Sequence, residues 1–278
     1  MHGILVVCDE TGVPAGIINA EEITGFRTSA SAIIGFTWRR CVDSIVVFGA
    51  GKQALWHIRL ALALRGDEVK SITVINRSKP RAQELVDRVK DENSSMWKSQ
   101  AVFNIVESAS SDYGSALKGL LAKADIIFCT VPSEKPLFSH EDLPAERRPY
   151  ISAIGSWQPN MVEVDPKLVQ RIAGDTAAYN PRHTGKGGIL VVDDAEGAMK
   201  HAGEVVHSGL SKDQTIELGE ILDMRTRSEE STQGLKAWLQ DGLVVYKSIG
   251  VSLTDLAAGE AILKLAKQHG VGLQVSDL

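Results

Sequence analysis

Short runs of apolar, mostly β-branched residues alternate along the chain with longer segments in which apolar residues recur at helical spacing. The runs lie at residues 45–48, 71–75, 101–106, 125–132, 150–154 and 188–192. Strands that alternate with helices in this way are typical of a doubly wound parallel sheet. We therefore expect an α/β protein of this class, with ligands bound at the carboxyl ends of its strands.

The two ends of the chain have a different pattern. Residues 4–7 and 15–18 predict two strands, and the turn-forming residues between them predict a hairpin. Residues 254–268 predict a final helix with an apolar stripe along one face. Because the two N-terminal strands have no other partner, we expect this helix to return and pack on them.

Composition excludes several classes of protein. A net charge of -5 gives no surface suited to nucleic acid or to an anionic membrane, so we expect neither as a partner. No apolar run approaches the ~20 residues of a membrane span, and the N-terminus lacks the basic start of a signal peptide. The three cysteines fit neither a disulfide framework nor a metal site. We expect a cytoplasmic protein with reduced thiols, of which Cys41 and Cys129 lie in the core.

The clearest motif joins the first strand of the predicted sheet to its helix. It has the pattern Gly-x-Gly-x-x-Ala and consists of Gly49, Ala50, Gly51, Lys52, Gln53 and Ala54. Gly49 permits the sharp exit from the strand, and Gly51 lets a pyrophosphate approach the backbone. The first helical amides and the helix dipole then face the phosphates. This pattern predicts a site for a dinucleotide.

The end of the second strand indicates which dinucleotide binds. In NAD-binding proteins this position carries an acid that bonds the ribose hydroxyls, and no acid is present here. Arg77 instead can pair with a 2′-phosphate, assisted by Asn76 and Ser78. We therefore expect NADPH, with NAD as the alternative.

The length of 278 residues is compatible with about two domains. We expect residues 41–240 to form the Rossmann domain that binds the dinucleotide. Residues 1–40 and 241–278 would then form a smaller, truncated α+β domain for substrate binding and dimerisation.

Several segments together resemble the ornithine cyclodeaminase/mu-crystallin family, in the family's order and over nearly the whole chain. They are TGFRTSA at 24–30, FGAGKQA at 48–54, NRS at 76–78, ADII at 124–127, IG at 154–155, EVD at 163–165, ELGE at 217–220 and KSIGVSLTDLAA at 247–258. Each segment alone is unspecific, whereas the set is specific. Trp56-His57 and the GSWQP segment at 155–159 resemble a fungal branch linked to proline utilisation.

The resemblance implies a nicotinamide-dependent enzyme that acts on amino acids or cyclic imines, usually as a homodimer. By matching position, Arg27 would bind the substrate carboxylate, for which the fork of a guanidinium is well suited. The remaining positions that would contact the cofactor are Thr130, Val131, Ile154, Ser156, Ser248 and Ile249. Lys247 would be either a catalytic donor or a part of the cofactor loop.

The chain departs from the family pattern in two ways. Family members begin upstream of Met1 with strands that carry a lysine and a second arginine of the substrate pocket. We therefore expect a chain that lacks this segment, with an incomplete pocket and dimer sheet. Trp157 stands where ornithine cyclodeaminases have an aspartate that transfers protons, which an indole cannot do.

Histidines provide no further candidate for catalysis. His57 and His183 are isolated in the sequence, so we expect each at a helix surface or in a loop. His201 and His207 lie six apart, which fits no helical metal spacing, and we expect no metal.

Three functions remain open. The first is an NADPH-dependent reductase of a small cyclic imine or ketimine carboxylate in proline- or ornithine-type metabolism. The second is a lyase that cyclises ornithine with recycled NAD, and it needs a substitute for the aspartate. The third is a catalytically inactive protein that binds NADPH.

Overall fold

The structure of the protein is a computed structural model that describes residues 3–182, 187–227 and 229–273. The chain divides into two compact units. The smaller consists of Met1–Thr28 and Val251–Leu278, and the larger consists of Ser29–Gly250.

These divisions differ from the expected ones near residues 40 and 241. The first falls within α1 (Ile23–Thr37), because Ile33 and Phe36 in the second half of this helix are buried in the core of the larger unit. The second falls later because Val244–Lys247 forms a central strand of the larger unit.

The described part of the larger unit contains one parallel sheet with the strand order β5-β4-β3-β6-β7-β10-β8-β9. Its strands are β3 (Ser44–Phe48), β4 (Ser71–Asn76), β5 (Val102–Glu107), β6 (Ile126–Cys129), β7 (Tyr150–Ala153), β8 (Leu190–Val192), β9 (Thr215–Glu217) and β10 (Val244–Lys247). The doubly wound sheet predicted from the sequence is confirmed. The three-residue strand β9 was not predicted.

The strand order reverses between β3 and β6. From β3 the chain first builds outward through β4 and β5, and it then returns to place β6 on the other side of β3. In open parallel sheets such a switch point leaves a crevice at the carboxyl ends of the strands, where ligands bind.

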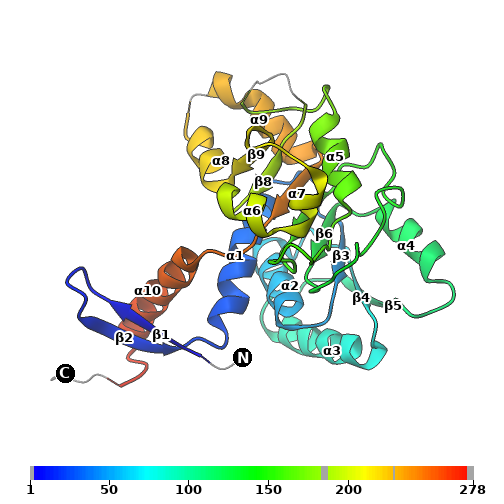
Figure 1. Cartoon of the computed structure of the whole chain (residues 1–278). Coiled ribbons are helices and arrows are strands. Elements are labelled where there is room, and N and C mark those ends of the chain that lie inside the picture. Colours follow the sequence, from blue (N-terminus) through cyan, green and yellow to red (C-terminus); the bar gives the residue numbers. More distant parts are fainter. Residues whose placement is uncertain (1–2, 183–186, 228, 274–278) are drawn as a thin grey trace. The chain divides into compact units, whose positions relative to one another are not determined.

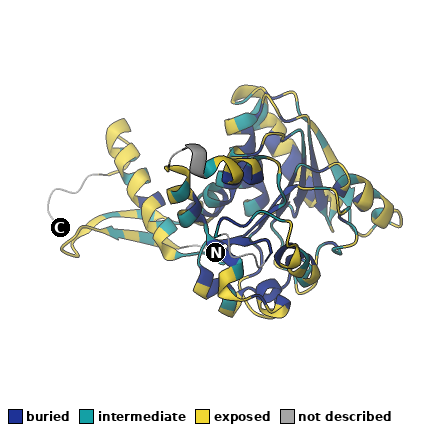
Figure 2. Ribbon diagram, turned by 90° about the horizontal axis from the view of Figure 1, so that it is seen from above, coloured by how far each residue is buried: buried dark blue, intermediate teal, exposed yellow. Residues whose placement is uncertain are grey.

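Helices cover both faces of this sheet (Figure 1). Alternation along β3 sends Ile45 and Val47 into one core and Val46 and Phe48 into the other. The second half of α1 packs on the first face with α2 (Lys52–Arg65), α3 (Lys79–Ser95), α8 (Leu218–Arg225) and α9 (Glu229–Asp241). The other face is covered by α4 (Tyr113–Leu121), α5 (Pro166–Gly174), α6 (Ala195–His201) and α7 (Gly203–Ser208). The central strands are accordingly the most buried part of this unit (Figure 2).

The smaller unit contains the predicted hairpin and the predicted final helix. Strands β1 (Ile4–Cys8) and β2 (Pro14–Asn19) pair antiparallel, and α10 (Ser252–His269) packs against one side of them. The approach is close, because a Cβ atom on Gly259 of α10 would lie 2.4 Å from Leu5 Cδ2. The expected packing of this helix on the N-terminal strands is therefore confirmed.

The cysteines differ in burial. Cys129 is buried, as expected, whereas Cys41 is exposed. Cys41 precedes β3, and its neighbour Val42 is the residue that turns into the core. The expectation that Cys41 lies in the core is wrong.

Candidate dinucleotide site and active site

The glycine turn lies at the carboxyl end of β3, beside the switch point. Gly49 has a φ of 107°, and its amide donates to the carbonyl of Ile75 at 2.8 Å, which ties the turn to β4. A Cβ atom on Gly49 would lie 2.7 Å from Thr130 Oγ1. Both the backbone angle and the close contact therefore require glycine at this position.

Gly51 is the N-cap of α2, and it is glycine for a different reason. A Cβ atom at Gly51 would meet no heavy atom of the described residues around it within 4 Å, and its φ of -104° is open to any residue. Thus the protein leaves a space over the first turn of α2, where Lys52 and Gln53 follow. A phosphate group fits such a space, because the backbone amides of a first helical turn and the helix dipole face it.

The end of β6 completes the floor of this turn. Thr130 bonds back to β3 through both its amide and its hydroxyl, which donate to the Phe48 carbonyl at 3.1 and 2.7 Å. Val131 Cγ2 would lie 3.0 Å from a Cβ atom on Gly49. Both residues thus lie at the switch point.

The end of β4 carries the predicted selectivity residues. Asn76 Nδ2 donates to the Ser78 carbonyl at 2.8 Å and closes the turn before α3. Arg77 lies exposed within this turn. Glu107, which was not among the predicted site residues, pairs in register with Asn76 from β5 and brings a carboxylate to the same edge of the sheet.

The segment after β10 is held by one carboxylate. Asp193 accepts from the Ser248 hydroxyl at 2.6 Å and from the amides of Ile249 and Gly250 at 3.1 and 2.8 Å. The adjacent Asp194 caps α6 by accepting from the Glu196 amide. Ser248 and Ile249, which were predicted to contact the cofactor, are therefore held by a side chain that follows the neighbouring strand β8.

Lys247 and Ser156 do not lie at the surface. Both are at most 1% exposed, and they meet two buried acids, Glu163 and Glu204. Lys247 Nζ lies 3.0 Å from Glu163 Oε1 and 3.2 Å from Glu204 Oε1. The Ser156 hydroxyl lies 2.7 and 2.6 Å from the two oxygens of Glu204. We therefore do not expect Lys247 to transfer a proton to a substrate. Ile154, one residue after β7, is partly exposed.

Arg27 belongs to the smaller unit. Its Nε donates to Asp255 Oδ1 at 3.1 Å, and the two side chains are 15% and 25% exposed. Asp255 stands in the first turn of α10. The guanidinium is thus anchored by a carboxylate and still partly accessible.

His57 is fully buried on the inner face of α2, so the expectation of a surface position is wrong. Its Nδ1 lies 2.8 Å from the Gln53 carbonyl and 2.8 Å from Ser29 Oγ. A carbonyl only accepts, so Nδ1 carries a proton. Burial lowers the pKa of His57 to about 4, against a weaker opposite effect of the bond to Gln53.

The other histidines form no site among the residues described. His201 and His207 are exposed, and His183 lies outside the described residues. Within the described ranges, no three acidic, cysteine or histidine side chains gather in a way that could hold a metal ion. None of the described helices is long and apolar enough to cross a membrane.

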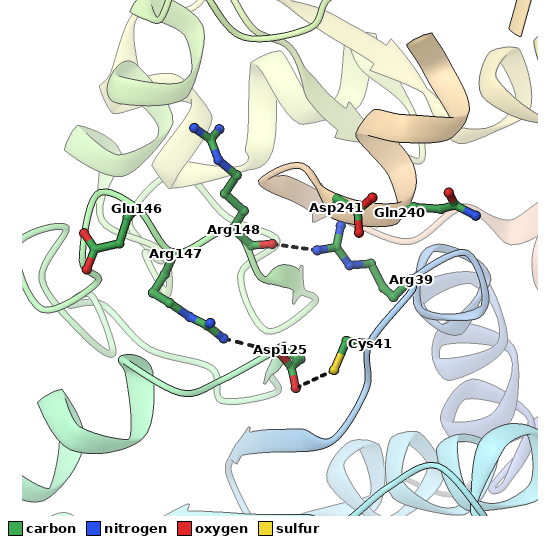
Figure 3. Close-up of a pocket in the computed structure, with 8 residues that line it drawn as sticks. All are labelled: Arg39, Cys41, Asp125, Glu146, Arg147, Arg148, Gln240 and Asp241. Carbon is green, nitrogen blue, oxygen red and sulfur yellow. Dashed lines mark hydrogen bonds and ion pairs between the residues drawn. The ribbon is translucent and has the colours of Figure 1, made fainter. Parts of the chain in front are cut away.

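A polar pocket of about 250 Å³ lies at the amino ends of the strands, where Cys41 precedes β3 and Asp125 precedes β6 (Figure 3). Its buried Arg39 donates to the carbonyls of Leu239, Gly242 and Arg148 at 3.0, 2.8 and 2.6 Å. This arginine therefore connects α9 with the segments that precede β10 and β7. The pocket is at the opposite ends of the strands from the glycine turn, so it is separate from the dinucleotide site.

The strand order and the glycine turn define an α/β protein of the Rossmann class. The chain belongs to the ornithine cyclodeaminase/mu-crystallin family, whose sequence model matches residues 1–269.

Three known proteins illustrate the similarity. An uncharacterised cyclodeaminase of Dictyostelium discoideum is 28% identical, over 96% of this chain and 70% of its own length. A Δ1-pyrroline-2-carboxylate reductase of Bacillus cereus is 23% identical, over 99% of this chain and 74% of its own. The solved Δ1-pyrroline-2-carboxylate reductase of Thermococcus litoralis, in complex with NADH and L-proline, superposes with a TM-score of 0.74 at 20% identity, over 99% of this chain and 74% of its own.

Proposed function

We propose that the protein is an NADPH-dependent reductase of small cyclic imines or ketimines that carry a carboxylate. The observation that carries this proposal is the space over Gly51 at the first turn of α2, beside the switch point of the sheet. This space fits the phosphates of a dinucleotide, and the backbone amides of the first turn of α2 are suited to bind them. The relatives named as pyrroline-2-carboxylate reductases support an imine as the substrate class.

Most of the predicted site residues have a role in this proposal. The amides at Gly51, Lys52 and Gln53 bind the pyrophosphate, and Arg77 pairs with a 2′-phosphate. Thr130, Val131, Ile154, Ser248 and Ile249 line the path toward the nicotinamide. When bound, NADPH supplies a hydride for the imine carbon. Arg27 binds the substrate carboxylate and so orients that carbon.

Reduction of an imine needs little proton transfer by the protein. A protonated imine is already electrophilic, so adding one hydride completes the amine. Trp157 is 49% exposed just after β7, and its indole N–H is no acid at neutral pH. This residue is therefore compatible with reduction and unfavourable for cyclodeamination, which requires an acid/base to release ammonia.

The test is oxidation of NADPH by the purified chain with a panel of imines. The panel contains five- and six-membered cyclic imines with the carboxylate on the imine carbon, and matched rings with the carboxylate elsewhere. The proposal expects turnover that requires the carboxylate on the imine carbon, and none with Gly51→Val. Release of proline and ammonia from ornithine, without net use of nucleotide, would instead establish the lyase. Tight NADPH binding without turnover of any imine would establish the inactive binding protein.

We further propose a cytoplasmic homodimer in proline- or ornithine-type metabolism. The outer face of the β1–β2 hairpin supports association, because Ile4, Val6 and Ile17 are exposed there. Light scattering of the purified chain and fractionation of cells that express it test the two statements. A monomer at all concentrations, or a membrane-bound or secreted protein, would contradict them.

A further inference from the structure

Four polar side chains meet beneath the carboxyl ends of β7 and β10 in the larger unit. They are Ser156, Glu163, Glu204 and Lys247, and none is more than 1% exposed. They come from the loop after β7, the segment before α5, helix α7 and the end of β10. Charged side chains are almost never buried to this degree unless they are paired, so the cluster has a specific role in the fold.

The hydrogen bonds of the cluster converge on one oxygen of Glu163. Its Oε1 accepts from the amides of Gly155 at 2.7 Å and Ser156 at 3.3 Å, and from Lys247 Nζ at 3.0 Å. Lys247 Nζ also donates to the Ala153 carbonyl at 3.3 Å and pairs with Glu204. Glu163 thus fixes the backbone of the loop that leads to Trp157.

The second oxygen of Glu163 is buried, and no hydrogen bond from the described residues reaches it. It faces the space that Gly155 leaves by lacking a side chain. A Cβ atom there would lie 2.7 Å from Glu163 Oε2 and 2.3 Å from the Val131 carbonyl, which follows β6. The loops after β6 and β7 therefore meet beside Gly155.

The charges within the cluster do not balance if both acids are ionised. Two carboxylates face a single ammonium, and Cys129 of β6, which lies beside them, is a buried thiol whose pKa burial raises well above its ordinary value. An uncompensated buried charge costs several kcal/mol, so the cluster is expected to hold one proton more than the lysine alone carries. Glu163 Oε2 is the oxygen without a partner and hence the atom that can carry this proton.

We propose that Glu163 is a positioning residue for the loop Gly155–Trp157, and that it holds this loop in its protonated form. This inference rests on the proposed function in one respect, which is that the loop Gly155–Trp157 lies next to the substrate. Burial raises the pKa of Glu163 to about 7, with Lys247 lowering it and Glu204 raising it, which agrees with a proton held at neutral pH. Ionisation at higher pH places a second negative charge beside Glu204 and loosens the loop.

The first measurement compares Glu163→Gln with Glu163→Ala in the intact chain, with the exposed acid change Glu196→Gln as the matched control. Gln is neutral and keeps an acceptor for the Gly155 amide, whereas Ala removes the acceptor. In hydrogen exchange, peptides that span Gly155–Trp157 should lose protection at least roughly tenfold in Glu163→Ala and should keep it in Glu163→Gln. A Gln variant as unprotected as the Ala variant would show that the carboxylate charge, not the neutral form, holds the loop.

The second measurement is the pH profile of imine reduction. Titration of the substrate affects wild type and Glu163→Gln equally. The ratio of the wild-type kcat to the kcat of Glu163→Gln therefore reports the pH dependence that Glu163 itself causes. We expect this ratio to fall at least roughly threefold between about pH 6 and about pH 8.5. A flat ratio would overturn the proposal. Failure of both proteins to reduce any imine contradicts the proposed function instead, and the exchange measurement still decides the role of Glu163.

A third measurement covers the case in which Glu163→Ala does not fold. A carboxyl whose pKa is higher in the folded state than in the unfolded chain stabilises the fold less as pH rises from about 4.5 to about 7. The stability of wild type relative to Glu163→Gln should therefore decline across this window. A constant difference would mean that the folded protein holds no such proton.

Discussion

Asp255 in the first turn of α10 holds Arg27 of α1 by an ion pair, with 3.1 Å between Oδ1 and the guanidinium Nε. The two residues are 228 positions apart in the chain, so the fold and not the local sequence brings them together. Because Asp255 binds Nε, it fixes the direction in which the guanidinium can face a carboxylate.

The first prediction concerns this pair. Asp255→Asn should raise KM for the imine carboxylate by roughly tenfold, about 1.4 kcal/mol, because a neutral amide then replaces the carboxylate that holds the guanidinium Nε. The change in kcat should be smaller. Glu260→Gln, an exposed acid on the same helix, is the control. A KM for Asp255→Asn equal to wild type, or lower, would show that the pair does not prepare Arg27 for substrate.

The second prediction concerns the choice between NADPH and NADH. Arg77→Ala should weaken NADPH binding by roughly 1.5–3 kcal/mol, because it removes a charge-assisted contact to the 2′-phosphate. Binding of NADH should change little. Arg88→Ala, an exposed arginine farther along α3, should affect neither. Dissociation constants from fluorescence titration check this, and an unchanged NADPH/NADH ratio would refute the assignment.

The third prediction separates the two glycines of the turn. Gly51→Val should abolish dinucleotide binding in a folded protein, because its side chain enters open space that the phosphates need. Gly49→Val should instead lower the free energy of unfolding by roughly 1–3 kcal/mol or more, since its φ is positive and Thr130 is in contact. Calorimetry and NADPH titration of both variants check this. Retained NADPH affinity in folded Gly51→Val would contradict the site.

The fourth prediction uses the buried His57. Its pKa is about 4 in the folded protein and 6.5 in the unfolded chain, so the unfolded chain binds the extra proton first as the pH falls. The free energy of unfolding of wild type, relative to that of His57→Asn, should therefore fall by roughly 3 kcal/mol as the pH drops from about 6.5 to about 4. Urea denaturation at a series of pH values measures this difference. A difference that does not change with pH would mean that His57 is accessible to protons in the fold.

The sequence predicted those parts of the fold that depend on local pattern. The β-branched runs and the glycine turn identified β3, α2 and their neighbours, because period and turn chemistry are read over a few residues. The return of α10 onto the hairpin also followed from the apolar face that β1 and β2 would otherwise expose.

The buried cluster could not be predicted in this way. Glu163 and Lys247 are 84 residues apart, and charged residues ordinarily indicate a surface. Only the strand order, which puts β7 beside β10, brings them together. His57 did carry a signal, because it shares a helical face with Ala54, Ile58 and Ala61, all of which are buried.

The central claim is that the protein transfers a hydride from NADPH to the carbon of a cyclic imine carboxylate. The most direct measurement uses NADPH deuterated at both C4 positions, Δ1-pyrroline-2-carboxylate as substrate and mass spectrometry of the product. We expect proline with one deuterium on its α-carbon and an equal amount of oxidised nucleotide. Proline without deuterium, or no proline while the folded protein binds NADPH, would contradict it.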